Sequence, residues 1–200
     1  MDFPRVKLPI TPPYPPMEAK SVERIPAGAQ WVYEPKWDGF RCLAFRDGDT
    51  VILQSKAGQP LGRYFPELVE DLSRTKVDRF VIDGEIVIVS NGKLSFDDLL
   101  MRIHPAESRV RKLADQSPAQ LLAFDLLVDG RGSDLSGLPL VERRAELEKL
   151  VPKLGAKRLE LSPSSGDRKE AERWMKDYGA MGCDGVVAKL DRKSTRLNSS

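Results

Sequence analysis

The feature of this sequence that most constrains its fold is a series of short apolar runs, several of which end at an Asp-Gly or Asn-Gly pair. Such pairs supply the positive φ angles that tight hairpin turns need, and runs of this length predict strands. The strands are expected at residues 31–34, 40–46, 50–54, 80–89, 120–128, 158–161 and 185–190. Because a hairpin joins antiparallel neighbours, the pattern predicts a largely antiparallel sheet.

Apolar residues recur at helical spacing in other segments, at residues 65–72, 106–115, 140–150 and 167–178. Strands outnumber helices, and hairpins alternate with longer connections. The expected class is therefore α+β, with mainly antiparallel sheets flanked by helices. No internal repeat is visible. A chain of 200 residues is long enough for one good core, or for one large domain that has lost a neighbour.

Prolines crowd the start of the chain, at positions 4, 9, 12, 13, 15 and 16. Since proline fixes φ and removes a backbone donor, residues 1–16 are expected to form an extended arm. The arm is either a peptide ligand for another protein or, as we favour, a leader laid over its own domain. The domain itself is expected at residues 17–191. Residues 192–200 have no periodicity, and we expect them to be an unstructured, non-native tail or a truncation scar.

Composition excludes several functional classes. No apolar run is long enough to span a membrane and no signal pattern opens the chain, so a cytoplasmic protein without membrane association is expected. The net charge of +2 excludes a histone-like basic coat, but it allows a local basic face. The cysteines, Cys42 and Cys183, have no zinc-ligand spacing. The single histidine, His104, is expected at the polar entry to a helix and not in a catalytic triad.

The tetrapeptide Lys36-Trp37-Asp38-Gly39 is the first candidate for chemistry. Lys36 ends one predicted strand, a glycine bend follows, and Arg41 opens the next strand. A lysine placed in this way can project into a cleft between strands. Its amine becomes a nucleophile where burial and nearby cations favour the neutral form. The alternative is an ordinary solvated lysine.

Asp83 and Glu85 interrupt the apolar strand at residues 80–89. They are two residues apart, so both side chains point to the same face of that strand. Buried carboxylates are costly unless they bind something, and a metal ion or a ribose hydroxyl would be a functional partner. The alternative is a half-exposed strand that carries solvated acids.

Three further segments have both a functional and an ordinary interpretation. Phe124-Asp125-Leu126 places an aromatic ring in a buried-looking strand, where phenylalanine is most often a core residue. Lys56 is a cation in the loop Ser55-Lys56-Ala57-Gly58. Asp184 stands at the start of the last strand, with Lys189 further along it.

Taken together and in this order, these segments resemble the nucleotidyltransferase motifs of ATP-dependent DNA ligases, most closely those of the bacterial end-joining type. The resemblance covers roughly residues 14–191 and implies an ATP-grasp-like nucleotidyltransferase domain. The matching segments are Glu34 to Arg41, Ser55 to Gly58, Val81 to Ile86, Phe124 to Leu126 and Asp184 to Lys189, with Arg63 to Leu68 and His104 to Val110 in support.

The resemblance also implies a role for each residue. Lys36 would attack the α-phosphorus of ATP and hold AMP as a phosphoramidate. Glu34 would lie beside the adenine, on which Phe124 would stack. Arg41 and Glu85 would contact the ribose or the phosphates.

The remaining roles concern phosphate and metal. Lys56 would face the 5′-phosphate of a nick, and Lys189 belongs with the cofactor-binding residues. Glu85 and Asp184 are the expected contacts of Mg²⁺ or Mn²⁺, since hard oxygen ligands suit these ions. Asp184 and Lys56 depart from the family, which usually has Glu and Arg at these positions.

The expected function is that of a ligase adenylation domain, which forms lysyl-AMP on Lys36 for transfer to a DNA 5′-phosphate in strand joining and repair. The expected partners are nicked or broken duplex DNA and a Ku-like end-binding protein, for a monomer associated with the bacterial nucleoid. The family continues with a Lys-x-Lys motif and an OB-fold domain that we do not find, so the copy is expected to be C-terminally incomplete. The alternatives are an RNA ligase or a capping-type enzyme, an inactive nucleotide-binding fragment, and an interaction module that uses the Pro-rich arm.

Overall fold

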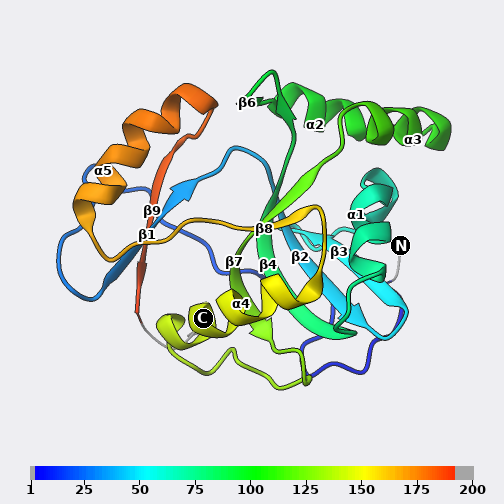
Figure 1. Ribbon diagram of the computed structural model, residues 1–200, viewed down its shortest axis with the longest axis horizontal. Helices are drawn as coiled ribbons and strands as arrows, with labels where there is room; N and C mark the ends of the chain where they lie inside the picture. The colour runs from blue at the N-terminus through cyan, green and yellow to red at the C-terminus, as the bar shows by residue number, and fades with distance from the viewer. Residues whose placement is uncertain (1–2, 192–200) are drawn as a thin grey trace.

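A computed structural model describes residues 3–191 of the chain (Figure 1). Its strands are β1 (Trp31–Lys36), β2 (Phe40–Asp47), β3 (Thr50–Ser55), β4 (Arg79–Val87), β5 (Val89–Ser90), β6 (Lys93–Leu94), β7 (Gln120–Val128), β8 (Leu159–Leu161) and β9 (Gly185–Leu190). Its α-helices are α1 (Pro66–Ser73), α2 (Phe96–Arg102), α3 (Glu107–Gln116), α4 (Leu140–Leu154) and α5 (Arg168–Asp177). Short 3₁₀ turns η1 (Gly62–Tyr64) and η2 (Gly179–Met181) complete the list.

The strands form one large sheet and two small ones. The large sheet has the order β3-β2-β4-β7-β8, and only its β7–β8 pair is parallel. β1 pairs with β9 in a separate antiparallel sheet, although the two strands lie at opposite ends of the sequence. β5 and β6 form a short hairpin. The largely antiparallel arrangement expected from the turn pattern is present, and β8 is the exception.

The two faces of the large sheet pack in two separate hydrophobic cores. One face packs against α1 and α4 through leucines such as Leu68 and Leu147, and this is the main hydrophobic core. On the opposite face, Leu43, Phe45 and Val81 form a second core. Arg41 is two positions from Leu43 on β2, and Asp83 is two positions from Val81 on β4, so both side chains point to that second face as well.

The proline-rich segment covers part of this second face. Leu8 and Ile10 are buried against Phe45 and its neighbours. The side-chain amide of Gln54 fixes the segment further on: its Oε1 accepts from the backbone N–H of Tyr14 at 2.8 Å, and its Nε2 donates to the Tyr14 carbonyl at 2.6 Å. Residues 3–14 therefore lie along the chain's own domain.

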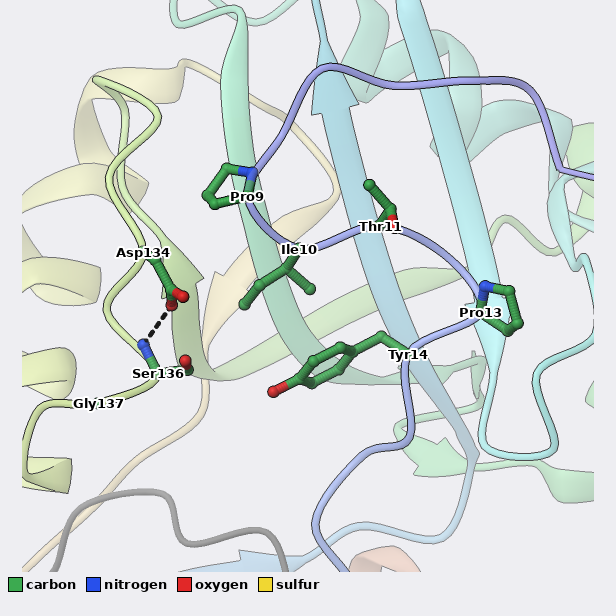
Figure 2. A pocket seen from close by; sticks show the side chains of 8 residues that line it. All are labelled: Pro9, Ile10, Thr11, Pro13, Tyr14, Asp134, Ser136 and Gly137. Atoms are coloured by element: carbon green, nitrogen blue, oxygen red, sulfur yellow. Dashed lines mark hydrogen bonds between the residues drawn. The ribbon is translucent and has the colours of Figure 1, made fainter.

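A shallow cavity of about 470 Å³ lies where this segment meets the loop after β7 (Figure 2). Ile10 and Tyr14 line one side, and Asp134 and Ser136 line the other. The Asp134 carboxylate accepts a hydrogen bond from the Ser136 backbone N–H at 2.8 Å, so it already has a partner. None of the candidate residues for chemistry lines this cavity.

The helices differ from expectation in two places. α2 was not expected; it is short, and Ser95 caps it by accepting a hydrogen bond from the Asp98 N–H at 3.3 Å. α4 continues past the expected end at residue 150 and includes Pro152. Its last turn is held because Leu154 is fully buried and Gly155 ends the helix with a φ of 68°. As expected, His104 stands at a helix entry, where its Nδ1 accepts from the Ala106 N–H at 3.0 Å.

Within residues 3–191, none of the helices is long and apolar enough to cross a membrane.

Candidate active site

Lys36 lies at the end of β1, where the small β1–β9 sheet meets the large sheet. Its carbonyl accepts a hydrogen bond from the Asp184 N–H at 3.0 Å, and its Nζ lies 2.6 Å from Asp184 Oδ2. The side chains of both residues are about half exposed, at 51% and 50%. Burial beside other cations, the setting that would favour the neutral amine, is therefore not what the structure shows at Lys36. The ammonium is held by a carboxylate at an open position.

More carboxylates surround this pair. Burial raises the pKa of Glu85 to about 8, and the charges of Asp83 and Asp38 add to that increase while Arg41 and Lys36 oppose it. The pKa of Asp38 is also raised, first by desolvation and then by the charge of Asp184. Lys36 thus stands among acidic groups that affect one another's ionisation.

Two glycines let the strands beneath these groups approach closely. A Cβ at Gly39 would lie 2.3 Å from the carbonyl oxygen of Ile86, and one at Gly84 would lie 2.6 Å from that of Leu122. Any larger residue would push the start of β2 off β4, or β4 off β7. Gly39 belongs to the same motif as Lys36, and Gly84 belongs to the same motif as Glu85. The two glycines therefore have a packing role in bringing Lys36 and Glu85 into one region.

Arg41 and Asp83 form an ion pair across β2 and β4, in which Asp83 is buried and Arg41 is partly exposed. Arg41 Nε and Nη2 donate to the two carboxylate oxygens of Asp83 at 2.6 and 2.7 Å. Burial alone would lower the pKa of Arg41, but the Asp83 carboxylate outweighs that effect and raises it. The interpretation of Asp83 as a solvated acid is wrong, because the residue is only 4% exposed. Its partner in this structure is Arg41.

Phe124 lies under two cations. The Arg41 guanidinium carbon is 4.5 Å from the ring centroid and Lys189 Nζ is 4.3 Å from it. Lys189 also pairs with Glu34 at 2.7 Å. Burial raises the pKa of Glu34, and Lys189 offsets only part of that increase. The four expected nucleotide-contacting residues Glu34, Arg41, Phe124 and Lys189 are thus in one cluster.

Phe124 reaches this face through an irregularity in β7. The register between β4 and β7 shifts after Asp83, so that Phe124 is the extra residue between the partners of Asp83 and Gly84. The next residue, Asp125, turns the other way and binds Arg143 of α4 through two hydrogen bonds of 2.8 and 2.7 Å. The one local sign of this buried pair is the acid within an apolar strand.

Lys56 is not part of this cluster in the described structure. It follows β3 and pairs with Glu18 at 3.4 Å, and both side chains are largely exposed. This position leaves Lys56 accessible to a large ligand such as a nucleic acid.

The carboxyl groups near Lys36 suit only one of the ways in which proteins usually bind Mg²⁺. No group of three or more His, Cys, Asp or Glu side chains within residues 3–191 is arranged to hold a metal ion. Mg²⁺ is commonly bound by one or two carboxylates together with substrate phosphates and water. Glu85 and Asp184 fit that mode, since both present carboxyl oxygens around Lys36.

The comparisons with known proteins agree with this geometry. A sequence profile described as the ATP dependent DNA ligase domain matches residues 16–196. The chain belongs to the ATP-dependent DNA ligase family. DNA ligase C of Mycobacterium tuberculosis is 49% identical over 187 residues, which are 92% of this chain and 51% of that protein. DNA ligase C2 of Mycolicibacterium smegmatis is 48% identical over 182 residues, or 91% of this chain and 50% of that protein.

Solved ligase structures share the fold. A mycobacterial DNA ligase D complexed with ATP and MES has a TM-score of 0.60 at 28% identity, covering 82% of this chain and 49% of that one. A Chlorella virus DNA ligase-adenylate has a TM-score of 0.58 at 17% identity, covering 90% of this chain and 61% of that one. The expected α+β nucleotidyltransferase fold and the resemblance to ATP-dependent ligases are confirmed. This ligase chain spans about half the length of the curated relatives it matches.

Proposed function

We propose that this ligase domain transfers AMP from ATP to Lys36, and that the complete enzyme passes the AMP to a DNA 5′-phosphate. The observation that carries the proposal is that Lys36 lies among Glu85 and Asp184 at the point where β1 meets the sheet that presents Phe124. The nucleophile comes from β1, the carboxyl groups come from β4 and from the residue before β9, and the aromatic platform comes from β7.

In the proposed reaction, Lys36 Nζ attacks the α-phosphorus and a nitrogen–phosphorus bond forms. The bond from the α-phosphorus to the bridging oxygen breaks, and pyrophosphate leaves with the electron pair. The ammonium must first lose a proton, and the Asp184 carboxylate at 2.6 Å is its nearest acceptor. Glu85 and Asp184 would hold Mg²⁺ or Mn²⁺, which would stabilise charge on the phosphate oxygens.

Two cations of the cluster suit the phosphates and the sugar. Arg41 already binds Asp83 through Nε and Nη2, and the remaining N–H groups of its guanidinium can contact a phosphate or a hydroxyl, while Lys189 is a compact point charge. Phe124 would stack on the adenine beside Glu34. Lys56, which is exposed on the loop after β3, is proposed to meet the 5′-phosphate of the DNA.

Covalent labelling tests the proposal. The chain is incubated with ATP labelled at the α-phosphate and with Mg²⁺ or Mn²⁺, both alone and as a chimera that continues with the carboxy-terminal half of mycobacterial DNA ligase C. We expect a labelled adduct in the wild type and its complete loss in Lys36→Ala. Lys149→Ala, an exposed lysine change on α4, is the matched control and should label normally.

Other outcomes would separate the alternatives. If neither protein forms the adduct but ATP still binds, the domain is an inactive nucleotide-binding module. Competition by unlabelled GTP that exceeds competition by ATP would favour a capping-type enzyme. Sealing of nicked RNA but not of nicked DNA by the chimera would favour an RNA ligase.

The proposed partners are nicked or broken duplex DNA and a Ku-like end-binding protein, in strand repair or recombination in the bacterial cytoplasm. The support is that the relatives are named DNA ligases and that this domain is similar to the ligase domain of M. tuberculosis LigD, with a TM-score of 0.60 at 28% identity. A monomer is proposed, and sedimentation of the chimera with and without nicked DNA would test its stoichiometry.

A further inference from the structure

Ser162 joins the strand that carries Phe124 to the turn that directly follows Lys36. Its backbone N–H donates to the carbonyl of Ala123 in β7 at 2.8 Å, one residue before Phe124. Its hydroxyl accepts from the indole N–H of Trp37 at 2.8 Å, one residue after Lys36. Ser162 is fully buried, and its hydrogen bond with Trp37 is partly buried.

Trp37 is held from the other side as well. Its ring centroid lies 5.3 Å from that of Tyr178, which follows α5 and packs with the small β1–β9 sheet. The indole is therefore clamped between an aromatic ring and a hydrogen-bond acceptor. Such a clamp fixes both the position and the rotation of the peptide that follows Lys36.

The position of Ser162 is itself fixed. Arg144 of α4 donates from Nη2 to the Ser162 carbonyl at 2.7 Å, and Glu148 holds the same guanidinium at 2.7 Å. Three residues further along, Ser165 pairs with Tyr33 of β1 through two backbone hydrogen bonds of 2.8 and 3.0 Å. Residues 162–165 thus run from the large sheet to the small one, and the hydrogen bonds of Ser162 fix the end of this segment at the large sheet.

We infer that Ser162 is a positioning residue for the adenylation step, acting on Lys36 through Trp37. The inference rests on the proposed function and deepens it. Lys36 lies on one sheet, whereas Phe124 and Glu85 lie on the other. The Trp37–Ser162 hydrogen bond sets the distance between the nucleophile and a nucleotide held on the large sheet.

Single-turnover adenylation of the chimera measures this effect. At saturating ATP, the amplitude reports the fraction of folded enzyme and the rate constant reports the placement of Lys36. A displacement of about 1 Å at a reacting group can lower the rate by about 100-fold, so we expect Ser162→Ala to slow the rate constant about 10- to 100-fold. The amplitude and the affinity for ATP should change little.

Two further variants complete the experiment. Trp37→Phe keeps an aromatic ring near Tyr178 but removes the donor, so it should slow the same step. The double variant should be no slower than the slower single one, because both changes remove one hydrogen bond. Ser164→Ala, which removes the same hydroxyl two residues away, should match the wild type.

The inference is overturned if Ser162→Ala has the rate constant of Ser164→Ala, if only its amplitude falls, or if the effects of the two single changes multiply in the double variant. A wild-type chimera that forms no adduct would instead refute the proposed function, and the positioning role with it. An active wild type with an unaffected Ser162→Ala rate refutes the positioning role alone.

Discussion

At the scale of single residues, the candidate site depends on close approaches as much as on charges. Gly84 stands between two acids that look like a ligand-binding pair, yet the space it leaves is filled by the backbone of β7. Gly39 plays the same role between β2 and β4. A glycine in a nucleotide-binding motif can thus be required by its neighbours in the fold before any ligand is considered.

Gly84→Ala tests this requirement. The added methyl would lie 2.6 Å from the Leu122 carbonyl oxygen and 2.9 Å from Leu121 Cδ1, so the strands must separate. Overpacking of this kind typically costs about 1–3 kcal/mol, and urea denaturation should show that loss of unfolding free energy. Gly137→Ala is the control, because its Cβ would meet nothing within 4 Å. Equal stability of the two variants would contradict the packing role.

Sequence reasoning found most of the candidate residues because they stand in short ordered motifs. Lys36, Glu34, Arg41, Phe124 and Lys189 all stand in such motifs. The pairing of β1 with β9, of β2 with β4 and of β4 with β7 contributes to their clustering. Ser162 and Trp37, which are in contact, lie 125 positions apart in the sequence. A serine next to a proline is typical of a linker. No local pattern could have indicated this contact.

At the scale of elements, the turn after β7 shows how a single carboxylate can hold a turn in place by accepting hydrogen bonds from its backbone. Asp129 Oδ1 accepts from the backbone N–H groups of Arg131 and Ser133 at 2.9 and 2.8 Å. Burial alone would raise the pKa of Asp129, but these hydrogen bonds outweigh it and hold the pKa below its usual value. The ionised form is therefore the one that stabilises the turn.

Asp129→Asn should change how stability depends on pH. A carboxylate whose pKa is lower in the folded state binds fewer protons there, so its contribution is present above about pH 4 and is lost as pH falls further. Asparagine keeps an acceptor oxygen but not the charge, and the variant should be about 1 kcal/mol less stable at pH 7. Denaturation midpoints should converge between about pH 4 and pH 2. A gap that does not vary with pH would contradict the assignment.

Among the elements, the strands were easier to predict than the helices. The strands are Val- and Ile-rich and several end at turn residues, whereas α2 is too short to show a helical period. Its one local signal is Ser95 followed three residues later by Asp98, which is typical of a helix start. α4 extends past its predicted end, because proline usually ends a helix whereas the burial of Leu154 that holds the last turn is a tertiary effect.

At the scale of the whole molecule, the proline-rich segment completes the domain. Leu8 and Ile10 are only 6% and 4% exposed and close the core formed by β2, β4 and β7. Figure 1 shows this segment in dark blue, running beneath the large sheet. The segment behaves as part of the core, even though it has no regular secondary structure.

Shortening either buried side chain should destabilise the whole domain. Leu8→Ala and Ile10→Ala each remove apolar contacts and leave a cavity, which typically costs about 2–5 kcal/mol. Thermal unfolding should show a lower midpoint for both variants. Val22→Ala, at a side chain that is 67% exposed, should stay within about 0.5 kcal/mol of the wild type. Unchanged midpoints for both core variants would mean that the segment is not packed as described.

The covered ring of Phe124 has a consequence for ligand binding. The residue is only 7% exposed, because Arg41 and Lys189 lie over it. Any flat group that stacks on this ring must therefore enter by exchange, displacing a cation whose own contact is worth about 0.5–2 kcal/mol. The measured binding free energy of such a ligand is then the difference between the free energy of its own stacking on Phe124 and that of the cation it displaces. The displaced cation is released beside the incoming ligand, where an anionic group on that ligand would retain it.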